Sequence, residues 1–199
     1  MSQMKLNRKN FCDPDFAQDY RKKHSKILQK LGDEYAEKLK KRKFLSGEIL
    51  DSGCGSGEML IRLAFQFTKC RLIGIDLSEP LLEYANHLKG MFNLNNRVQF
   101  IKGDVMKLPF NKNSFDVVFN VNMAHLMSDP IAMLNEMERV LKPDGHIFIR
   151  DLRYSWLKMF ESEIKYAFDM NKAKDLIDTS NIKPGNLSAN LLWWNFETS

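Results

Sequence analysis

The sequence is poor in cysteine and has no long apolar run. Its three cysteines, Cys12, Cys54 and Cys70, stand far apart. Such isolated thiols support neither a disulfide framework nor a zinc site, and no other pattern implies a metal. No stretch approaches the roughly 18 apolar residues that a membrane span requires, and the N-terminus lacks the apolar core of a secretory signal. We therefore expect a cytoplasmic protein with reduced thiols and no transmembrane segment.

Internal repeats and low-complexity tracts are also missing, which excludes a solenoid and a disordered chain. With 199 residues, of which 44% are hydrophobic, the chain suits one folded domain and is too short for two of ordinary size. We expect residues 1–45 to form a helical lid or extension. Residues 46–199 should then form a single folded unit.

The positive charge is concentrated near the N-terminus. The formal net charge is +5, and the excess of Lys and Arg lies within residues 1–43. Such a region can attract nucleic acid, an anionic substrate or a membrane surface. No aromatic residues interleave with the run Lys41-Arg42-Lys43, as a base-stacking surface would require. A solvated helix face is the simpler interpretation, so nucleic acid is disfavoured as a partner.

Short apolar strands alternate with helical patterns through the middle of the chain. Strands are expected at 48–52, 71–76, 98–101, 115–119 and 146–149. A helix should follow the first strand to about residue 67, another should follow Ser78 as its cap, and a third should begin at Pro130. This alternation predicts an α/β fold with a doubly wound, Rossmann-like, mainly parallel sheet and helices on both faces.

The pattern is less regular toward both ends. Residues 13–43 should be helical, with Gly32 breaking them into two helices. Residues 142–145 should form a turn before the fifth strand. Residues 156–168 suggest one amphipathic helix, and 191–196 a last strand. Only one clear strand then follows the fifth.

Three loops that follow strands carry residues suited to binding a nucleoside. Ligands of parallel sheets bind at the carboxyl ends of the strands. Gly53, Gly55 and Gly57 allow a close approach of backbone to ligand, although a tight turn alone also needs glycine. Asp76 ends the second strand, where a carboxylate can accept from both ribose hydroxyls, and Asp104 can accept from an adenine amine. Together the loops suggest an adenosine-containing ligand.

Four ordered motifs resemble those of class I S-adenosylmethionine-dependent methyltransferases. They are 51–57 (DSGCGSG), 103–110 (GDVMKLPF), 114–118 (SFDVV) and 138–145 (ERVLKPDG). The resemblance covers residues 48–150. It is to the branch that contains many small-molecule and quinone methyltransferases, the methyltransferase type 11 branch.

The resemblance implies S-adenosyl-L-methionine as cofactor and assigns roles to particular residues. The loop would hold the methionine part of the cofactor, Asp76 the ribose and Leu77 one face of the adenine. Asp104 and Val105 would border the adenine. The implied cofactor-binding residues are Asp51, Gly53, Cys54, Gly55, Gly57, Asp76, Leu77, Asp104, Val105, Asn120, close to the transferable methyl, and Tyr20, as a cover. Asn120 is equally well explained as a strand-end cap and Tyr20 as core packing.

His125 is the candidate catalytic residue. Direct in-line displacement mainly requires alignment and exclusion of water. A general base helps when the acceptor carries a proton, and His125 follows the fourth strand, where the family commonly has a histidine. A packing or hydrogen-bonding role is the alternative. Asp151 and Arg153 follow the fifth strand, where substrate contacts or a surface salt bridge would explain them.

The acceptor is expected to be a small molecule. After the fourth strand, the run Asn120-Val121-Asn122-Met123 lacks the Pro-Pro-aromatic loop typical of adenine or glutamine methylation. Two rival functions stay open. One is a non-enzymatic protein that binds S-adenosylmethionine; the other is an NAD-dependent oxidoreductase, disfavoured because Leu60 stands where a third glycine would be needed. The oligomeric state is not predicted.

Overall fold

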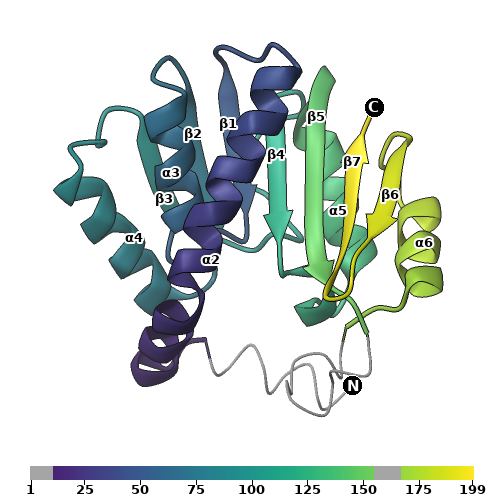
Figure 1. Ribbon diagram of the computed structural model, residues 1–199, viewed down its shortest axis with the longest axis horizontal. Coiled ribbons are helices and arrows are strands. Elements are labelled where there is room, and N and C mark those ends of the chain that lie inside the picture. Colours follow the sequence, from purple (N-terminus) through teal and green to yellow (C-terminus); the bar gives the residue numbers. More distant parts are fainter. Residues whose placement is uncertain (1–10, 155–166) are drawn as a thin grey trace. The chain divides into compact units, whose positions relative to one another are not determined.

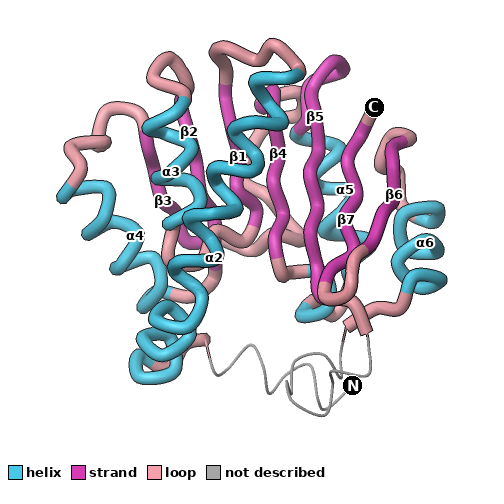
Figure 2. The backbone as a smooth tube through the Cα atoms, in the orientation of Figure 1, coloured by secondary structure: helices cyan, strands magenta, loops and turns pink. Residues whose placement is uncertain are grey.

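The computed structural model describes residues 11–154 and 167–199. These residues divide into two compact units, Met1–Asp104 and Val105–Ser199. Strands and helices alternate in both units (Figures 1 and 2).

The first unit is built on three parallel strands. They are β1 (Glu48–Ser52), β2 (Arg71–Asp76) and β3 (Val98–Lys102), in the order β3-β2-β1. Each of the first two is followed by a helix, α3 (Glu58–Gln66) and α4 (Glu79–Met91), so every connection is a crossover. The three strands expected from the sequence are therefore confirmed. Their carboxyl ends lie at one edge, which brings together the loops after β1, β2 and β3.

Helix α2 (Pro14–Lys41) is a single helix of 28 residues, so the expected break at Gly32 is wrong. Gly32 is instead a point of close helix contact. A Cβ added there would lie 2.7 Å from Cβ of Arg62 and 2.9 Å from the carbonyl oxygen of Met59, both on α3. Glycine is required because α2 and α3 approach so closely, and the cost of glycine within a helix is offset by this packing.

Helix α4 begins as the sequence predicts. The Ser78 hydroxyl accepts a hydrogen bond from the amide of Leu81, and Pro80 lies in the first turn. Serine at this position satisfies one of the backbone N–H groups that a helix start leaves without a partner. The same residue closes the loop after β2, so the cap also fixes the end of that strand.

The second unit contains two parallel strands and an antiparallel pair. The strands β4 (Phe115–Val121) and β5 (Leu141–Leu152) are parallel; β7 (Trp193–Thr198) is antiparallel to β5, and β6 (Gly185–Ala189) to β7. The order is β4-β5-β7-β6. The expectation of only one strand after the fifth is wrong, because β6 is polar and mostly exposed and carries no apolar alternation.

The fifth strand is longer than expected at both ends. It begins at Leu141, so the turn expected at 142–145 lies within β5. Leu141 pairs with Phe115 and His146 with Val117, so residues 142–145 bulge from the ladder. The Pro143-Asp144-Gly145 sequence has turn chemistry, but strand pairing resumes on both sides of it.

Two helices accompany these strands. Helix α5 (Pro130–Val140) starts at Pro130 as predicted, with Asp129 as its cap. Helix α6 (Met170–Thr179) was not predicted. The helix expected at 156–168 lies mostly outside the described residues, but Phe168 forms a β-bridge with Arg153, so that end is not helical.

The expected α/β class with a mainly parallel sheet is confirmed. Large apolar side chains fill the interior of each unit, as the hydrophobic effect requires. The first unit buries mostly aliphatic residues and the second stacks aromatic ones, with Phe119 and Phe148 5.3 Å apart between ring centroids. The largest fully buried side chains include Leu39, Ile49, Leu50, Leu60, Leu63, Leu72, Ile75 and Leu81 in the first unit and Trp194, Phe119, Phe148 and Phe196 in the second.

Candidate cofactor site

The loop after β1 depends on glycine for its shape. Gly53, Gly55 and Gly57 all have positive φ, at 96°, 51° and 78°. Side chains strongly disfavour this region of backbone space, whereas glycine does not. The amides of Gly53 and Cys54 both donate to the carbonyl of Ile75 on β2, at 2.8 and 3.0 Å. The loop is therefore folded back onto the end of the second strand.

Two glycines also leave room for neighbouring side chains. A Cβ at Gly57 would lie 2.6 Å from Cζ of Phe100 and 2.9 Å from Cβ of Ala85. A Cβ at Gly74, in β2, would lie 2.7 Å from Sγ of Cys54. Gly74 was not singled out from the sequence, although a glycine inside a buried strand is itself a sign of close backbone approach.

The carboxylate of Asp76 is held rigidly at the end of β2. Its Oδ2 accepts from the amide of Gly55 at 2.8 Å, and its Oδ1 accepts from the amide of Ser78 at 2.9 Å. Burial raises the pKa of Asp76, and the backbone hydrogen bonds from Ser78, Gly55 and Leu77 oppose that rise. Each carboxylate oxygen keeps a second lone pair for a further donor. Asp76 can therefore accept two hydroxyl groups without giving up its contacts to the loop.

Asp51 is a buried carboxylate with one oxygen that lacks a hydrogen-bond partner within the described residues. Its exposed fraction is 2%, and Oδ1 has no hydrogen-bond partner within the described residues. Burial, with a smaller contribution from the charge of Asp76, raises the pKa of Asp51 to about 8. A buried polar atom without a partner is costly and marks a place for a ligand group or water. A cationic ligand group would satisfy Asp51 and favour its ionised form.

The third loop lies beside the second. The amide of Gly103 donates to the carbonyl of Asp76 at 3.0 Å, which brings the half-buried Asp104 next to the end of β2. Leu77, immediately after Asp76, is 40% exposed and offers an apolar surface there. Three of the predicted binding positions thus share one edge of the first unit.

An aromatic cluster from the start of α2 adjoins this edge. Phe11 makes edge contacts with Phe16 and Tyr20, at 5.1 and 5.0 Å between ring centroids. The carbonyl of Phe11 accepts a hydrogen bond from the hydroxyl of Ser78, two residues after Asp76. The half-buried Tyr20 is therefore tied to the end of β2 through its aromatic neighbours. It also contributes to packing, as the alternative interpretation proposed.

In the second unit, His125 is paired with Asp151. Nδ1 of His125 forms a short hydrogen bond with Oδ1 of Asp151, and the backbone amide of His125 donates to Oδ2 of the same residue at 3.3 Å. The exposed fractions are 3% for His125 and 0% for Asp151. Asp151 lies within β5, which extends to Leu152, so neither a position after the strand nor a surface salt bridge describes it. Its carboxylate orients the imidazole ring.

Two further predicted positions in the second unit are buried. Asn120, near the end of β4, is fully buried, and its Nδ2 lies 3.5 Å from Sδ of Met133. Val105 is 2% exposed. The guanidinium of Arg153 donates to the carbonyl of Asn190 at 2.8 Å. Sequence reasoning found these positions but could not find their partners.

Residues 46–194 match the protein family described as methyltransferase domain. The chain belongs to this methyltransferase domain family. It is 27% identical to malonyl-[acyl-carrier protein] O-methyltransferase of Legionella pneumophila, over 83% of this chain and 57% of that protein. It is 33% identical to demethylmenaquinone methyltransferase of Lactococcus lactis, over 75% of this chain and 60% of that protein. The chain thus spans less than two thirds of each of these relatives.

Solved structures show the same fold. A Methanococcus maripaludis protein, proposed to be an S-adenosyl-L-methionine-dependent methyltransferase, matches with a TM-score of 0.78 at 20% identity, over 94% of this chain and 93% of that one. At this identity the likeness establishes the Rossmann-like architecture of the methyltransferase domain. The strand-loop-helix order that places Asp76 after the glycine loop is part of that architecture.

Cys54, in the glycine loop, is buried. Burial above all, then the charges of Asp76 and Asp51, raises the pKa of the Cys54 thiol well above its ordinary value, so Cys54 stays protonated. No group of three or more His, Cys, Asp or Glu side chains in the described ranges could hold a metal ion. None of the helices within 11–154 and 167–199 is both long and apolar enough to cross a membrane.

Proposed function

We propose that this chain is a class I methyltransferase that uses S-adenosyl-L-methionine to methylate a small molecule. The observation that carries the proposal is the carboxylate of Asp76, held by the glycine loop beside the partnerless Oδ1 of Asp51. When bound, this cofactor supplies a methyl group on a positively charged sulfur, which departs as a neutral thioether. Methyl transfer to an acceptor then needs alignment and exclusion of water more than a dedicated catalytic group.

The residues of the first unit fit the cofactor's functional groups. Asp51 would accept from the ammonium group, and Asp76 from both ribose hydroxyls, using the lone pairs that its loop contacts leave available. Leu77 would cover the adenine, and Asp104 would accept from its exocyclic amine. Backbone contacts would hold the methionine part, from the four loop residues Gly53, Cys54, Gly55 and Gly57. The resemblance further assigns Val105 to the adenine and Asn120 to the methionine part.

Residues 1–45 would act as a lid over this site, and residues 46–199 as the methyltransferase domain. Tyr20 would cover the bound cofactor. The link from Phe11 to Ser78 supports this role, because it places the aromatic cluster at the end of β2. Closure over the cofactor would exclude water from the reaction.

Calorimetric titration tests the cofactor directly. We expect S-adenosyl-L-methionine and S-adenosylhomocysteine to bind with micromolar affinity and NADH not to bind. Binding of NADH alone would favour the oxidoreductase. Binding of both sulfur ligands without turnover across a panel of phenols, quinols, amines and carboxylic acids would favour a non-enzymatic binding protein.

The affinity for S-adenosyl-L-methionine should depend on pH through the ionisation of Asp51. Because its pKa is about 8 in the ligand-free protein, Asp51 is mostly protonated at pH 7 and must lose a proton to pair with an ammonium group. Affinity should rise by up to tenfold per pH unit between about pH 6 and 7.5. It should fall again above about pH 8, where the ligand's own α-amino group deprotonates. Asp51→Asn should remove the rising limb and keep the falling one.

Calorimetry at pH 7 in two buffers of different ionisation enthalpy checks this prediction. The wild type should release close to one proton on binding, and Asp51→Asn fewer. Folding stability changes with pH in the opposite direction to cofactor affinity. The stability that protonated Asp51 contributes is fully present below its unfolded pKa of about 3.8 and is lost as pH rises through about 8. A pH-independent affinity from 6 to 7.5 would contradict the assignment of Asp51.

The pair His125–Asp151 would assist acceptors that must lose a proton. Nε2 of His125 would take the acceptor's proton as the new bond to the methyl carbon forms. The imidazolium would then be stabilised by the Asp151 carboxylate through Nδ1–H. Asp151 acts here as a positioning residue, since its carboxylate contacts His125 and the backbone amide of Leu152.

His125→Ala is expected to lower kcat by about 10² to 10⁴-fold and to leave cofactor affinity within twofold of wild type. Asp151→Asn should lower kcat less and shift the acidic limb of the pH–rate profile, because it changes the basicity and tautomer of His125. Initial rates with the best acceptor of the panel give both values. If kcat and the pH profile stay at wild-type values while the melting temperature drops, His125 is a packing residue.

The acceptor is proposed only as a class. The relatives named above act on malonyl-[acyl-carrier protein] and on demethylmenaquinone, so the substrate loops of this family vary independently of its fold.

We further propose a cytoplasmic location. The isolated spacing of Cys12, Cys54 and Cys70 in the sequence supports this proposal, because paired cysteines are typical of oxidising compartments.

A further inference from the structure

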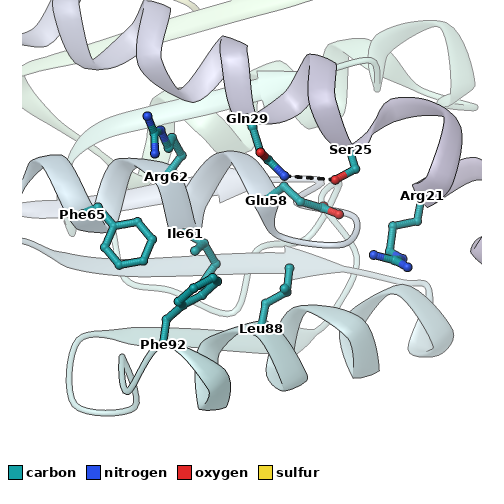
Figure 3. Close-up of a pocket in the computed structure, with 9 residues that line it drawn as sticks. All are labelled: Arg21, Ser25, Gln29, Glu58, Ile61, Arg62, Phe65, Leu88 and Phe92. Atoms are coloured by element: carbon teal, nitrogen blue, oxygen red, sulfur yellow. Dashed lines mark hydrogen bonds between the residues drawn. The ribbon is translucent and has the colours of Figure 1, made fainter.

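A cavity of about 220 Å³ lies between helices α2, α3 and α4 of the first unit (Figure 3). None of its lining residues belongs to the proposed cofactor site. Its volume suits a molecule smaller than a typical drug. One end of the cavity is polar and the other is apolar.

The polar end contains a buried carboxylate, Glu58, at the start of α3. Glu58 is 4% exposed, and its Oε2 accepts a hydrogen bond from the hydroxyl of Ser56. Its Oε1 has no hydrogen-bond partner in the described part of the chain. Burial raises the pKa of Glu58, while the hydroxyls of Ser56 and Ser25 and the charge of Arg21 oppose that rise. Oε1 of Glu58 can therefore accept a hydrogen bond from a molecule in the cavity.

The same end also offers a donor. The guanidinium of Arg21 lies over the ring of Tyr84, 4.5 Å from its centroid, and its buried Nε has no partner among the described residues. Figure 3 shows Arg21 and Glu58 at one end of the cavity, with Ser25 beside them accepting from Gln29. A group that both donates and accepts would satisfy Glu58 and Arg21 together.

The apolar end is an exposed aromatic pair. Phe65 of α3 and Phe92 at the end of α4 meet edge to face at 5.2 Å, and each is 44% exposed. Ile61 and Leu88 also line this part of the cavity, and Arg62, which is paired with Asp33, lies at its edge beside Phe65. A flat ring placed here would bury apolar surface that the protein leaves in water.

We infer that this cavity binds a small aromatic molecule with a neutral hydroxyl or primary amide head. The head donates to Oε1 of Glu58 and accepts from Nε of Arg21, and the ring lies against Phe65 and Phe92. A purely anionic head would leave Glu58 unsatisfied, and a purely cationic one would leave Arg21 unsatisfied.

Occupancy of the cavity is coupled to the glycine loop. Ser56, which donates to Glu58, is fully buried and stands between Gly55 and Gly57. The amide of Gly55 is in turn a donor to Asp76. A head group bound to Glu58 therefore acts on the loop through Ser56 and changes cofactor affinity, and this coupling rests on the proposed function.

Benzamide is the probe, because its amide carries both donor and acceptor. In ¹H–¹⁵N spectra of the full chain, we expect saturable shifts of amides in α3 and α4, with a Kd on the order of 1 mM. Glu58→Gln should weaken binding about fivefold or more, and Leu88→Trp, which fills the apolar end, should abolish it. Glu83→Gln, a matched change of an exposed acid on α4, should change nothing. Dispersed spectra establish that each variant is folded.

The affinity for S-adenosylhomocysteine, measured with and without saturating benzamide, tests the coupling. We expect a change of about threefold or more, lost in Glu58→Gln. Absence of saturable shifts, or equal Kd values in wild type and both cavity variants, would overturn the binding site. An affinity for S-adenosylhomocysteine that benzamide leaves unchanged would overturn the coupling. If that ligand does not bind at all, the proposed function fails, and the benzamide shifts still decide the cavity.

Discussion

Asp76→Ala is expected to weaken the binding of S-adenosyl-L-methionine by about 100-fold or more. In the proposed binding mode, the variant would remove two charge-assisted hydrogen bonds to the ribose, each worth about 1.5 to 3 kcal/mol. It also leaves the amides of Gly55 and Ser78 without the acceptor that now orients them. The loss should therefore exceed the value of the direct contacts, and calorimetric titration measures it.

Two variants separate the direct contacts from the effect on the loop. Asp76→Asn keeps one carbonyl oxygen that can accept from the loop, so it should lose less affinity than Asp76→Ala. Asp144→Ala, which removes an exposed aspartate from the 142–145 bulge, is the matched control and should bind as the wild type does. Affinity of Asp76→Ala within threefold of wild type would refute the ribose assignment.

Gly57→Val should destabilise the fold by about 3 kcal/mol or more. Its φ of 78° is unfavourable for a branched side chain, and the new Cβ would overlap Phe100 and Ala85. For a chain of this size, such a loss lowers the melting temperature by roughly 6 to 12 °C. Urea unfolding with and without S-adenosylhomocysteine should also show weaker stabilisation by the ligand, since the loop cannot keep its shape.

Gly90→Ala is the informative control for this change. A Cβ at Gly90, on helix α4, meets nothing within 4 Å. Alanine should there stabilise the helix by up to about 1 kcal/mol. The two glycine substitutions are thus expected to have opposite signs, and a Gly57→Val protein as stable as wild type would show that the loop relaxes without cost.

Much of the first unit could be predicted because its signals are local. The strands 48–52 and 71–76 are short buried runs followed by glycine or a capping serine, and both have the expected bounds. Ser78 caps α4 as its neighbours suggest. Even here, the helix break predicted at Gly32 is wrong. Glycine is required there because of contact with α3, which lies far along the sequence.

The second unit was harder because its signals are weak or non-local. Strand β6 is exposed and polar, so no alternation marks it. Helix α6 had a usable signal in the cap Asp169 followed by the buried Ala173 and Leu176, but its surface charges obscured the pattern. The bulge at 142–145 looks like a turn in sequence, and only pairing with β4 makes it part of a strand.

The site divides in the same way. Asp76 follows from its place at the end of β2, and the glycines follow from their spacing in the loop between β1 and α3. The pKa of Asp51 and the pairing of His125 with Asp151 depend on burial and on residues distant in the sequence. Glu58 had no motif at all, and only the packing of three helices reveals its partnerless oxygen.

The close contact at Gly32 makes this residue the point about which helix α2 would tilt relative to α3. The helix is fixed against α3 where Gly32 meets Arg62, and an ion pair from Asp33 to Arg62 reinforces that point. Tyr20 lies twelve residues toward the N-terminus, about 18 Å along the helix axis. A tilt of about 5° at the pivot then displaces the aromatic cluster by about 1.5 Å over that arm. Such a tilt would break the hydrogen bond from Ser78 to Phe11 and move Arg21 off the ring of Tyr84, while the contact at Gly32 stays in place.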